Sequence, residues 1–445
     1  MAFAKSGEPF FYFWFRRDLR LHDNRGLAAA LNSGAKVRPV FVLDETILSQ
    51  LKNPEDRRVQ FIYQQLVELK TELVDLGSDL WVEFGRPEVV WNRWLIQDGS
   101  LGIYCNEDYE PSARERDQKI AELCRSLGQK YEAFKDQVVF AKDEIQTDLG
   151  KPYTVYTPYK KKWLKQLSPD DLRSAESEKW VENFLPAKTP SKFLSFSEIG
   201  FKASSFDFPD VAVSTKRISS YARTRDFPAL TEGTSHLGIH LRFGTVSARE
   251  LAREGQKHSE VWLSELIWRE FFMQVLWHHP RVERQSFRTE FESVAWRKNA
   301  RELERWQMGE TGYPMVDAGM RELNTTGFMH NRVRMVVASF LTKHLLHHWY
   351  EGERYFASRL LDYDLAANNG NWQWAAGTGC DAAPYFRIFN PTAQAARFDP
   401  QHEYIRKWVP EFNTARYTQP MVVHEEARAR ALAAFAEVKK KESGN

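Results

Sequence analysis

The stretch Leu361–Asn390 reads LDYDLAANNGNWQWAAGTGCDAAPYFRIFN and concentrates carboxylates, asparagines, tryptophans and glycines. The paired carboxylates Asp362 and Asp364 precede an Asn- and Trp-rich segment, Asn368–Trp374, and the glycines permit tight turns and close backbone approach. A metal site is disfavoured, because no histidine is spaced to join the carboxylates. The many aromatic residues of the chain either fill a large core or form a site for a flat ligand, since flat ring systems stack on aromatic faces.

The predicted helix Trp262–His278 (WLSELIWREFFMQVLWH) places charges among aromatic residues. At a period of 3.6 residues, one face carries Trp262, Glu265, Arg269 and Phe272. Glu265 and Arg269 are spaced for a salt bridge along the helix, whereas charges in apolar surroundings often mark a site. Spacing alone leaves both interpretations open.

The predicted helix Phe328–His348 shows a similar pattern. Asn331 and Arg334 share a face of this helix. They either form the polar edge of a helix that is otherwise part of the core, or point into a cavity and bind a polar ligand. At the end of this segment, the histidines of His344–His348 (HLLHH) are favoured as packed or surface residues over a metal site.

Two segments place glycines and hydroxyl residues before predicted helices: Gly233–Ser235 and Gly244–Ser247. They serve either as ordinary N-caps or as an anion site suited to a pyrophosphate. The chain has no GxGxxG fingerprint, so a nicotinamide dinucleotide site is not supported.

The first part of the chain alternates strand and helix patterns. Short apolar runs typical of buried strands lie at Phe10–Phe15, Val37–Leu43, Leu80–Phe84 and Leu101–Cys105. Helical patterns between them cover Leu27–Leu31, Arg57–Leu76 and Ser112–Leu127. This alternation predicts an α/β domain with a parallel, Rossmann-like sheet, which we place at residues 1–140.

Residues 141–200 are punctuated by prolines and predict a partly structured interdomain linker region. From there on only helical patterns remain, at Ser247–His258, Ser259–His278, Ala300–Met308, Met315–Asn324, Phe328–His348 and Glu353–Leu361. Residues 201–445 therefore predict an all-helical domain. Its charged terminal helix, Glu425–Lys441, is expected to be a solvated surface.

Composition restricts the class of protein. The net charge of +2 gives no global nucleic-acid signature, so DNA binding would need a local basic patch. The three cysteines, Cys105, Cys124 and Cys380, are odd in number and far apart, which disfavours a disulfide framework or a zinc site. No apolar run reaches the length of a membrane span, and we expect a cytoplasmic protein without metal.

Together these motifs resemble the photolyase–cryptochrome family. The resemblance begins at Trp14–Leu27 (WFRRDLRLHDNRGL) and is strongest from Tyr221 to Trp408, with Leu361–Asn390 as its most specific part. It implies an α/β antenna domain joined to a helical domain that binds FAD. The site residues are carried over motif by motif, and they fall into three sets.

The first set would hold FAD, with Arg334 pairing Asp362 beside the ring system and Asn368 facing the reactive flavin nitrogen. Its members are Tyr221, Thr234, Ser235, His236, Leu237, Trp262, Arg269, Asn331, Arg334, Asp362, Asp364 and Asn368. The second set would bind damaged DNA: Glu265, Trp268, Asn331, Arg332, Met335, Trp374 and Arg387. Trp268 and Trp374 would stack on flipped bases, Glu265 would hydrogen-bond the lesion, and Arg332 and Arg387 would contact phosphates.

The third set is a chain of tryptophans, Trp372, Trp349 and Trp296, which would carry electrons from the surface to reactivate oxidised flavin. With Glu265 and Asn368 these residues make up the expected catalytic set. The implied activity is that of a carbon–carbon lyase: excited, reduced FAD gives an electron to a pyrimidine dimer, the cyclobutane bonds break, and the electron returns. The DNA would be single- or double-stranded, without sequence preference, and the protein a monomer.

Within the family, Asn331 and Met335 suit a cyclobutane dimer pocket, and the presence of both Asn368 and Trp374 favours the bacterial-type (class I) repair enzyme over plant cryptochromes. The alternative is a cryptochrome-type blue-light sensor with the same FAD, and a more distant one is a flavin oxidoreductase that works in the dark. A second, antenna chromophore is expected. Ser112 and Ala113 replace the Asn-Glu pair of folate-binding relatives, which puts folate in doubt and leaves a deazaflavin, a flavin or an empty antenna site.

Overall fold

The computed structural model describes residues 8–443. The chain packs as two compact units, and each is made of segments that are not contiguous in sequence. The first unit takes the described residues up to Ala141, with Leu167–Val213 and His236–Glu254. The second takes Lys142–Gln166, Ser214–Ser235 and the described residues from Gly255 onward. We expected contiguous domains with boundaries at 140 and 200; residues 142–166 instead pack with the helical unit, and 236–254 with the sheet unit.

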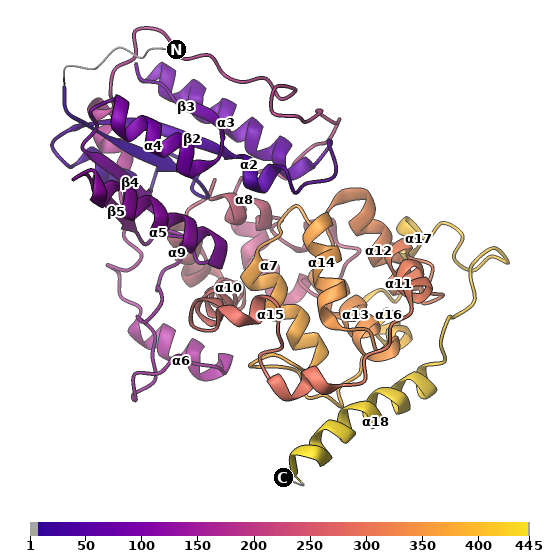
Figure 1. The fold of residues 1–445 in the computed structure, drawn as a ribbon. Coiled ribbons are helices and arrows are strands. Elements are labelled where there is room, and N and C mark those ends of the chain that lie inside the picture. Colours follow the sequence, from indigo (N-terminus) through magenta and orange to yellow (C-terminus); the bar gives the residue numbers. More distant parts are fainter. Residues whose placement is uncertain (1–7, 444–445) are drawn as a thin grey trace. The chain divides into compact units, whose positions relative to one another are not determined.

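The first unit is built on a five-stranded parallel sheet with the strand order β3-β2-β1-β4-β5 (Figure 1). Its strands are β1 (Phe10–Phe15), β2 (Lys36–Asp44), β3 (Trp81–Gly85), β4 (Gly102–Asn106) and β5 (Lys130–Phe134). Its helices are α1 (Arg25–Leu31), α2 (Glu45–Leu48), α3 (Arg57–Asp75), α4 (Pro87–Gln97), α5 (Pro111–Ser126), the 3₁₀ turn η1 (Ser177–Asn183), α8 (Gly238–Phe243) and most of α9 (Ala248–His258). The predicted parallel α/β architecture is confirmed.

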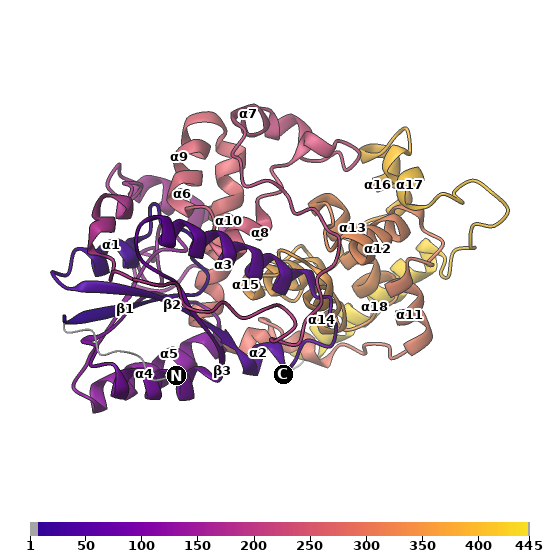
Figure 2. The ribbon, with the colours of Figure 1, turned by 90° about the horizontal axis from the view of Figure 1, so that it is seen from above.

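β1 lies at the centre of the sheet, which explains its unbroken apolar sequence. All six of its residues are buried, because helices cover both faces of a parallel sheet. On one face Tyr12 and Trp14 pack against Trp91 and Trp94 of α4, and Figure 2 shows α4 and α5 together on the side of the sheet away from α3. At the start of β4, Gly102 has a φ of 140°, and a side chain there would collide with the backbone of β5.

A buried charge network holds α9 against the sheet unit. The fully buried Arg249 contacts both Asp23 and Asp136 at 2.8 Å, and Arg20 contacts Asp136 at 2.6 Å. The Ser247 hydroxyl donates to Asp23 at 2.6 Å. Buried charges are tolerated only when paired, so these contacts explain why residues 236–254 pack with the sheet and not with the other helices.

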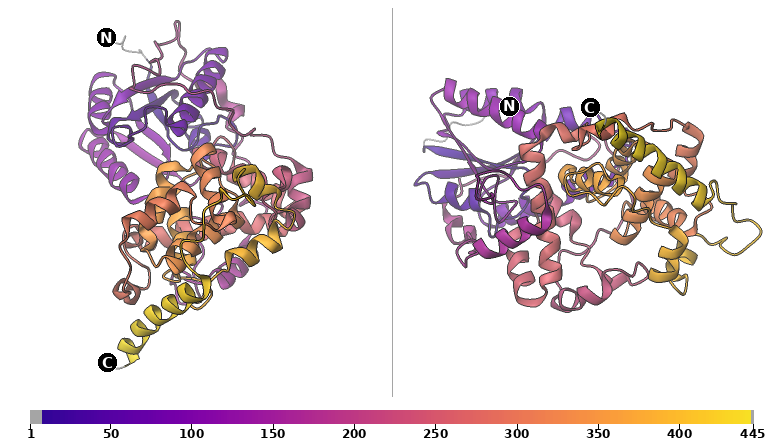
Figure 3. Two further views of the ribbon diagram at one scale, coloured as in Figure 1. Left: turned by 90° about the vertical axis from the view of Figure 1, so that its right-hand side faces the viewer. Right: turned by 90° about the horizontal axis from the view of Figure 1, so that it is seen from below.

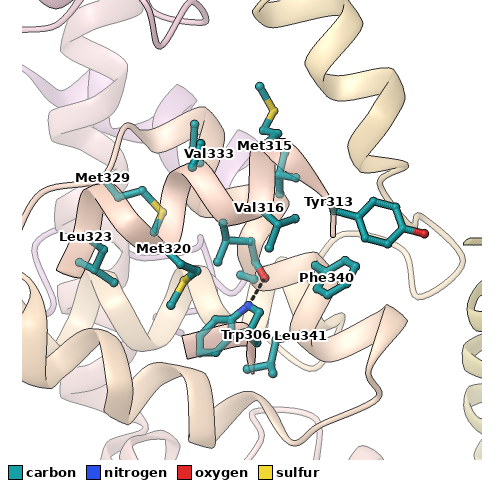
Figure 4. Packing of buried hydrophobic residues seen from close by; sticks show 14 of the residues in the cluster. Trp306, Tyr313, Met315, Val316, Met320, Leu323, Met329, Val333, Phe340 and Leu341 are labelled. Atoms are coloured by element: carbon teal, nitrogen blue, oxygen red, sulfur yellow. Dashed lines mark hydrogen bonds between the residues drawn. The ribbon is translucent and has the colours of Figure 1, made fainter. Parts of the chain in front are cut away.

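The second unit is helical. Its helices are α6 (Tyr156–Gln166), α7 (Thr215–Thr224), α10 (Glu260–His278), α11 (Ala300–Met308), α12 (Pro314–Thr326), α13 (Asn331–Ser339), α14 (Trp349–Arg359), α15 (Leu365–Ala376), α16 (Pro391–Phe398), α17 (Glu403–Trp408) and α18 (His424–Ser443). Short turns at η2 (Thr231–Gly233), η3 (Pro280–Glu283) and η4 (Thr289–Ser293), and the π-helical turn η5 (Phe340–His344), join them. The core is formed mainly by α11 to α15, and Figure 4 shows the Trp306 indole donating to the Val337 carbonyl inside it.

Two expectations about the helices were wrong. The helix predicted at Phe328–His348 is shorter: α13 runs on into η5, which ends at His344, and Leu346 beyond it has a positive φ. The terminal helix α18 is not merely a solvated surface, since Ala431 and Phe435 are buried against η4 and η5. Figure 3 follows α18, in yellow, along the other helices of its unit.

Among the described residues, no helix is long and apolar enough to cross a membrane.

Candidate functional site

The candidate residues gather around α15 in the helical unit. This helix starts at Asp364, whose carboxylate caps it by accepting from the Ala367 N–H at 3.2 Å. It packs against α10, α13 and α14. These four helices carry most of the expected cofactor, lesion and electron-transfer residues, so segments more than a hundred residues apart in sequence meet at one place.

Arg334 of α13 and Asp362, just before α15, form an ion pair. The Nη2 of Arg334 lies 3.1 Å and 3.0 Å from the two carboxylate oxygens of Asp362. The Nε of Arg334 donates to the Met329 carbonyl at 2.7 Å. Both side chains are partly exposed. The pair places a fixed charge and a carboxylate side by side, an arrangement that can hydrogen-bond the polar edge of a flat heterocycle.

Asn368 is buried and donates its amide to Glu353 of α14. Its Nδ2 lies 2.9 Å from the Glu353 carboxylate and 3.2 Å from the Glu353 carbonyl. Both amide hydrogens are therefore directed at Glu353, so the Asn368 Oδ1 remains the atom able to accept a hydrogen bond from a ligand. Burial raises the pKa of Glu353 to about 7, with Asn368 opposing the rise.

Glu265 of α10 pairs with Arg225, which follows α7. Arg225 also lies over the Tyr221 ring, 5.3 Å from its centroid. Burial raises the pKa of Glu265, while Arg225 lowers it. Burial is the larger effect, so the pKa of this carboxyl is raised overall, and a carboxyl whose pKa is shifted by burial beside a charged partner is a candidate site residue.

Trp268 is half-buried and already has an aromatic partner. Its ring stacks on Tyr156 of α6 with centroids 3.5 Å apart and planes within 7°. The Tyr156 hydroxyl donates to the Ser264 carbonyl at 2.9 Å, which fixes this partner on α10. Phe272 also stacks on the Trp268 ring, with centroids 5.4 Å apart and planes 27° apart, so a base that stacked on Trp268 would compete with these aromatic partners.

Trp374 lines a small hollow of about 20 Å³ in the helical unit. Phe272 of α10, Phe287, and Gly370 and Gln373 of α15 contribute to its wall. This lining is mostly apolar, with a few amides and the Asp381 carboxylate, and the hollow has room for about one water molecule.

The three tryptophans of the expected electron chain differ in burial. Trp372 and Trp349 are buried, whereas Trp296 is partly exposed. Gly352 of α14 lies against the Trp372 indole so closely that a side chain there would collide with it. The series thus runs from the core toward the surface.

The remaining expected DNA contacts lie at the surface of the helical unit. Asn331 and Arg387 are exposed, and Met335 is half-buried. Arg332 has partners within the protein, since it contacts Asp226 at 2.6 Å and lies 4.3 Å from the Phe398 ring centroid. Any phosphate would compete with Asp226 for this guanidinium.

The other expected cofactor residues are divided between the units. Tyr221, Thr234, Ser235, Trp262 and Arg269 lie in the helical unit, whereas His236 and Leu237 lie in the sheet unit. In Gly244–Ser247 the hydroxyls are used inside the protein: Thr245 bonds His240 at 2.7 Å, and Ser247 caps α9 and contacts Asp23. The N-cap interpretation of that segment is therefore favoured.

Several partners of site residues were not found from the sequence, among them Glu353, Arg225, Tyr156 and Asp226. Each lies on a different helix or loop from the residue that it contacts. His344 of the HLLHH segment bonds His424 at 2.8 Å, and no cluster of three or more metal-ligating side chains occurs in the part of the chain that the structure describes.

Two family models match the chain. The model for DNA photolyase matches residues 12–178, and the model for the FAD binding domain of DNA photolyase matches residues 262–416. The second match covers the four helices of the candidate site.

Known proteins are similar over nearly the whole chain. Deoxyribodipyrimidine photo-lyase of Escherichia coli is 38% identical, over 96% of this chain and 98% of its own length. A bacterial class III photolyase from Agrobacterium tumefaciens has a TM-score of 0.85 at 31% identity, covering 99% of this chain and 100% of its own. An archaeal photolyase from Sulfolobus tokodaii with two FAD molecules has a TM-score of 0.82 at 34% identity, covering 96% of this chain and 99% of its own.

Proposed function

This chain belongs to the photolyase–cryptochrome family of FAD-binding proteins, and from that premise we propose that it repairs cyclobutane pyrimidine dimers in DNA with light. The observation that carries the proposal is the arrangement along α15. Asn368 directs its amide oxygen away from Glu353, Trp372 is buried in the core, and Trp374 lines a hollow. One helix thereby supplies a cofactor contact, an electron carrier and a lesion contact.

The residues around α15 fit FAD. The Arg334–Asp362 pair would hold the polar edge of the ring system, and Asn368 would accept a hydrogen bond from the flavin nitrogen. When bound and reduced, FAD supplies one electron on excitation with blue light and takes it back after bond cleavage. The Glu353 contact keeps the Asn368 amide in one orientation, so the chain presents an acceptor at a fixed place.

The lesion would leave the duplex to reach this site. Flipping costs a few kcal/mol, and the cost is smallest for a base pair that damage has already weakened. Trp374 would stack on the flipped bases, and Glu265, in its protonated form, would donate to a pyrimidine carbonyl. Arg332 and Arg387 would contact phosphates, which positions the DNA without reading its sequence. We therefore expect activity on single- and double-stranded DNA.

A second chromophore would bind in the sheet unit. The Sulfolobus relative carries two FAD molecules, which supports a flavin at such a site. In this chain Ser112 and Ala113 lie in the first turn of α5, and the preceding Glu110 is paired with Arg17 and Arg242. Because neither Ser112 nor Ala113 offers the carboxylate of the Asn-Glu pair of folate-binding relatives, we favour a flavin or a deazaflavin over folate.

The test separates repair from light sensing. Purified, reduced protein is mixed with single-stranded DNA that carries cyclobutane dimers, and dimers are counted after blue light and after the same time in the dark. We expect their loss in the light alone. Full occupancy by FAD without any loss of dimers would refute repair and favour the light sensor.

A further inference from the structure

The imidazole of His348 lies between two of the three tryptophans in the expected electron chain. Its ring centroid is 5.4 Å from that of Trp349, with planes 32° apart, and 5.3 Å from that of Trp296, with planes 77° apart. Both distances are those of rings in contact. His348 therefore contacts both a buried indole and a partly exposed one.

Two contacts fix this ring. His348 is the N-cap of α14, and its Nδ1 accepts from the Tyr350 N–H at 3.2 Å. Because Nδ1 accepts, the proton of the neutral ring is on Nε2, which faces the Glu292 carboxylate of η4 at 3.9 Å. Burial lowers the pKa of His348, with Glu292 and Glu351 opposing the fall. At neutral pH the ring is then uncharged.

We propose that His348 is a positioning residue for electron supply, which couples Trp349 to Trp296 through its ring. This inference rests on the proposed function. If a bound flavin drew an electron through Trp372, the indole of Trp349 would be left oxidised, and in the coupled step it would regain one electron from Trp296. Trp296 is oxidised, Trp349 is restored, no bond breaks, and His348 keeps its proton.

Physical reasons support a ring at this position. Electron transfer weakens more steeply across empty space than across packed atoms, and His348 is a packed ring in contact with both indoles. An uncharged ring also adds no positive charge beside an oxidised indole, whereas a cation in contact would oppose its formation.

Two substitutions separate the ring from the helix cap. His348→Asn keeps a good N-cap, since an Asn side chain accepts from the same backbone N–H, but it removes the ring. His348→Phe keeps a ring of similar size but removes the acceptor. If His348 couples the two indoles, His348→Asn should slow flavin photoreduction severalfold and shorten the lifetime of the oxidised tryptophan, measured by transient absorption. His348→Phe should leave both the rate and the lifetime unchanged.

Thermal unfolding of the flavin-free chain gives an independent readout. Loss of the cap predicts a melting temperature lower by about 2 °C for Phe and nearly unchanged for Asn. Thus His348→Phe should unfold at the lower temperature but transfer electrons normally. His348→Asn should be stable but transfer electrons slowly. A residue that only capped α14 would give the reverse pattern.

The control is Trp349→Phe. If it photoreduces as the unchanged protein does, the tryptophan chain itself is wrong and the present inference is overturned with it. If Trp349→Phe slows photoreduction but His348→Asn does not, only the role of His348 is refuted. The same conclusion follows if His348→Phe slows photoreduction as much as His348→Asn does. The dimer-repair assay is decided separately, with chemically reduced protein.

Discussion

Glu353 offers a quantitative test of the site, because its carboxyl is buried beneath Asn368. The ordinary pKa of 4.5 applies in the unfolded chain, and burial raises the folded value to about 7. Between these values the folded state binds the proton more tightly, so the free energy of unfolding falls as pH rises. The difference of two to three pKa units corresponds to about 3 kcal/mol, fully felt above pH 7.

The perturbation is Glu353→Gln, which keeps the shape and an oxygen that accepts from the Asn368 amide. The variant should match the unchanged protein at about pH 5 and exceed its free energy of unfolding by up to about 3 kcal/mol at about pH 8. Urea unfolding of the two proteins across this range measures the difference. Glu322, whose pKa burial also raises to about 7, is present in both proteins and cancels.

The matched control is Glu304→Gln on α11, where the side chain is exposed and the substitution should leave the pH dependence unchanged. Parallel pH profiles for Glu353→Gln and the unchanged protein would refute the reasoning, since they would mean that Glu353 pays no cost for ionising beneath Asn368.

The other predictions concern tryptophans. Trp372→Phe should slow photoreduction and leave repair by chemically reduced protein nearly intact. Trp306→Phe is the control, because the Trp306 ring packs 6.1 Å from that of Trp372 but lies outside the expected electron chain. Equal loss of photoreduction and repair in Trp372→Phe would refute the carrier role. Trp268→Ala should weaken binding of dimer-containing DNA by roughly 1–3 kcal/mol if the ring stacks on a base. Equilibrium titration checks this, and an unchanged affinity would remove Trp268 from the lesion pocket.

The central strand of the sheet could be predicted from the sequence because it is buried on both faces. β1 is an unbroken apolar run because helices cover it on both sides, and its prediction matched the structure residue for residue. β5 was missed for the opposite reason: it is an edge strand whose residues are partly or fully exposed, so KYEAF has no apolar run. The break after α13 was also missed, since a π-helical turn changes the hydrogen bonding without interrupting the apolar pattern.

In the site, sequence motifs identified residues but not most of their partners. The Arg334–Asp362 contact was expected from the resemblance and is present. The contacts of Asn368 with Glu353, Glu265 with Arg225, and Trp268 with Tyr156 were not expected. Each joins residues from different helices, so it depends on tertiary packing that no local spacing encodes.

The central claim is light-driven repair without net consumption of electrons, and turnover after a single reduction tests it most directly. The protein is reduced once, excess reductant and oxygen are removed, and an oligonucleotide with one thymine dimer is supplied in excess. Under blue light each protein should restore many dimers to intact thymines, with none restored in the dark. Repair that stopped at one dimer per protein, or that proceeded in the dark with a nicotinamide cofactor, would contradict the account.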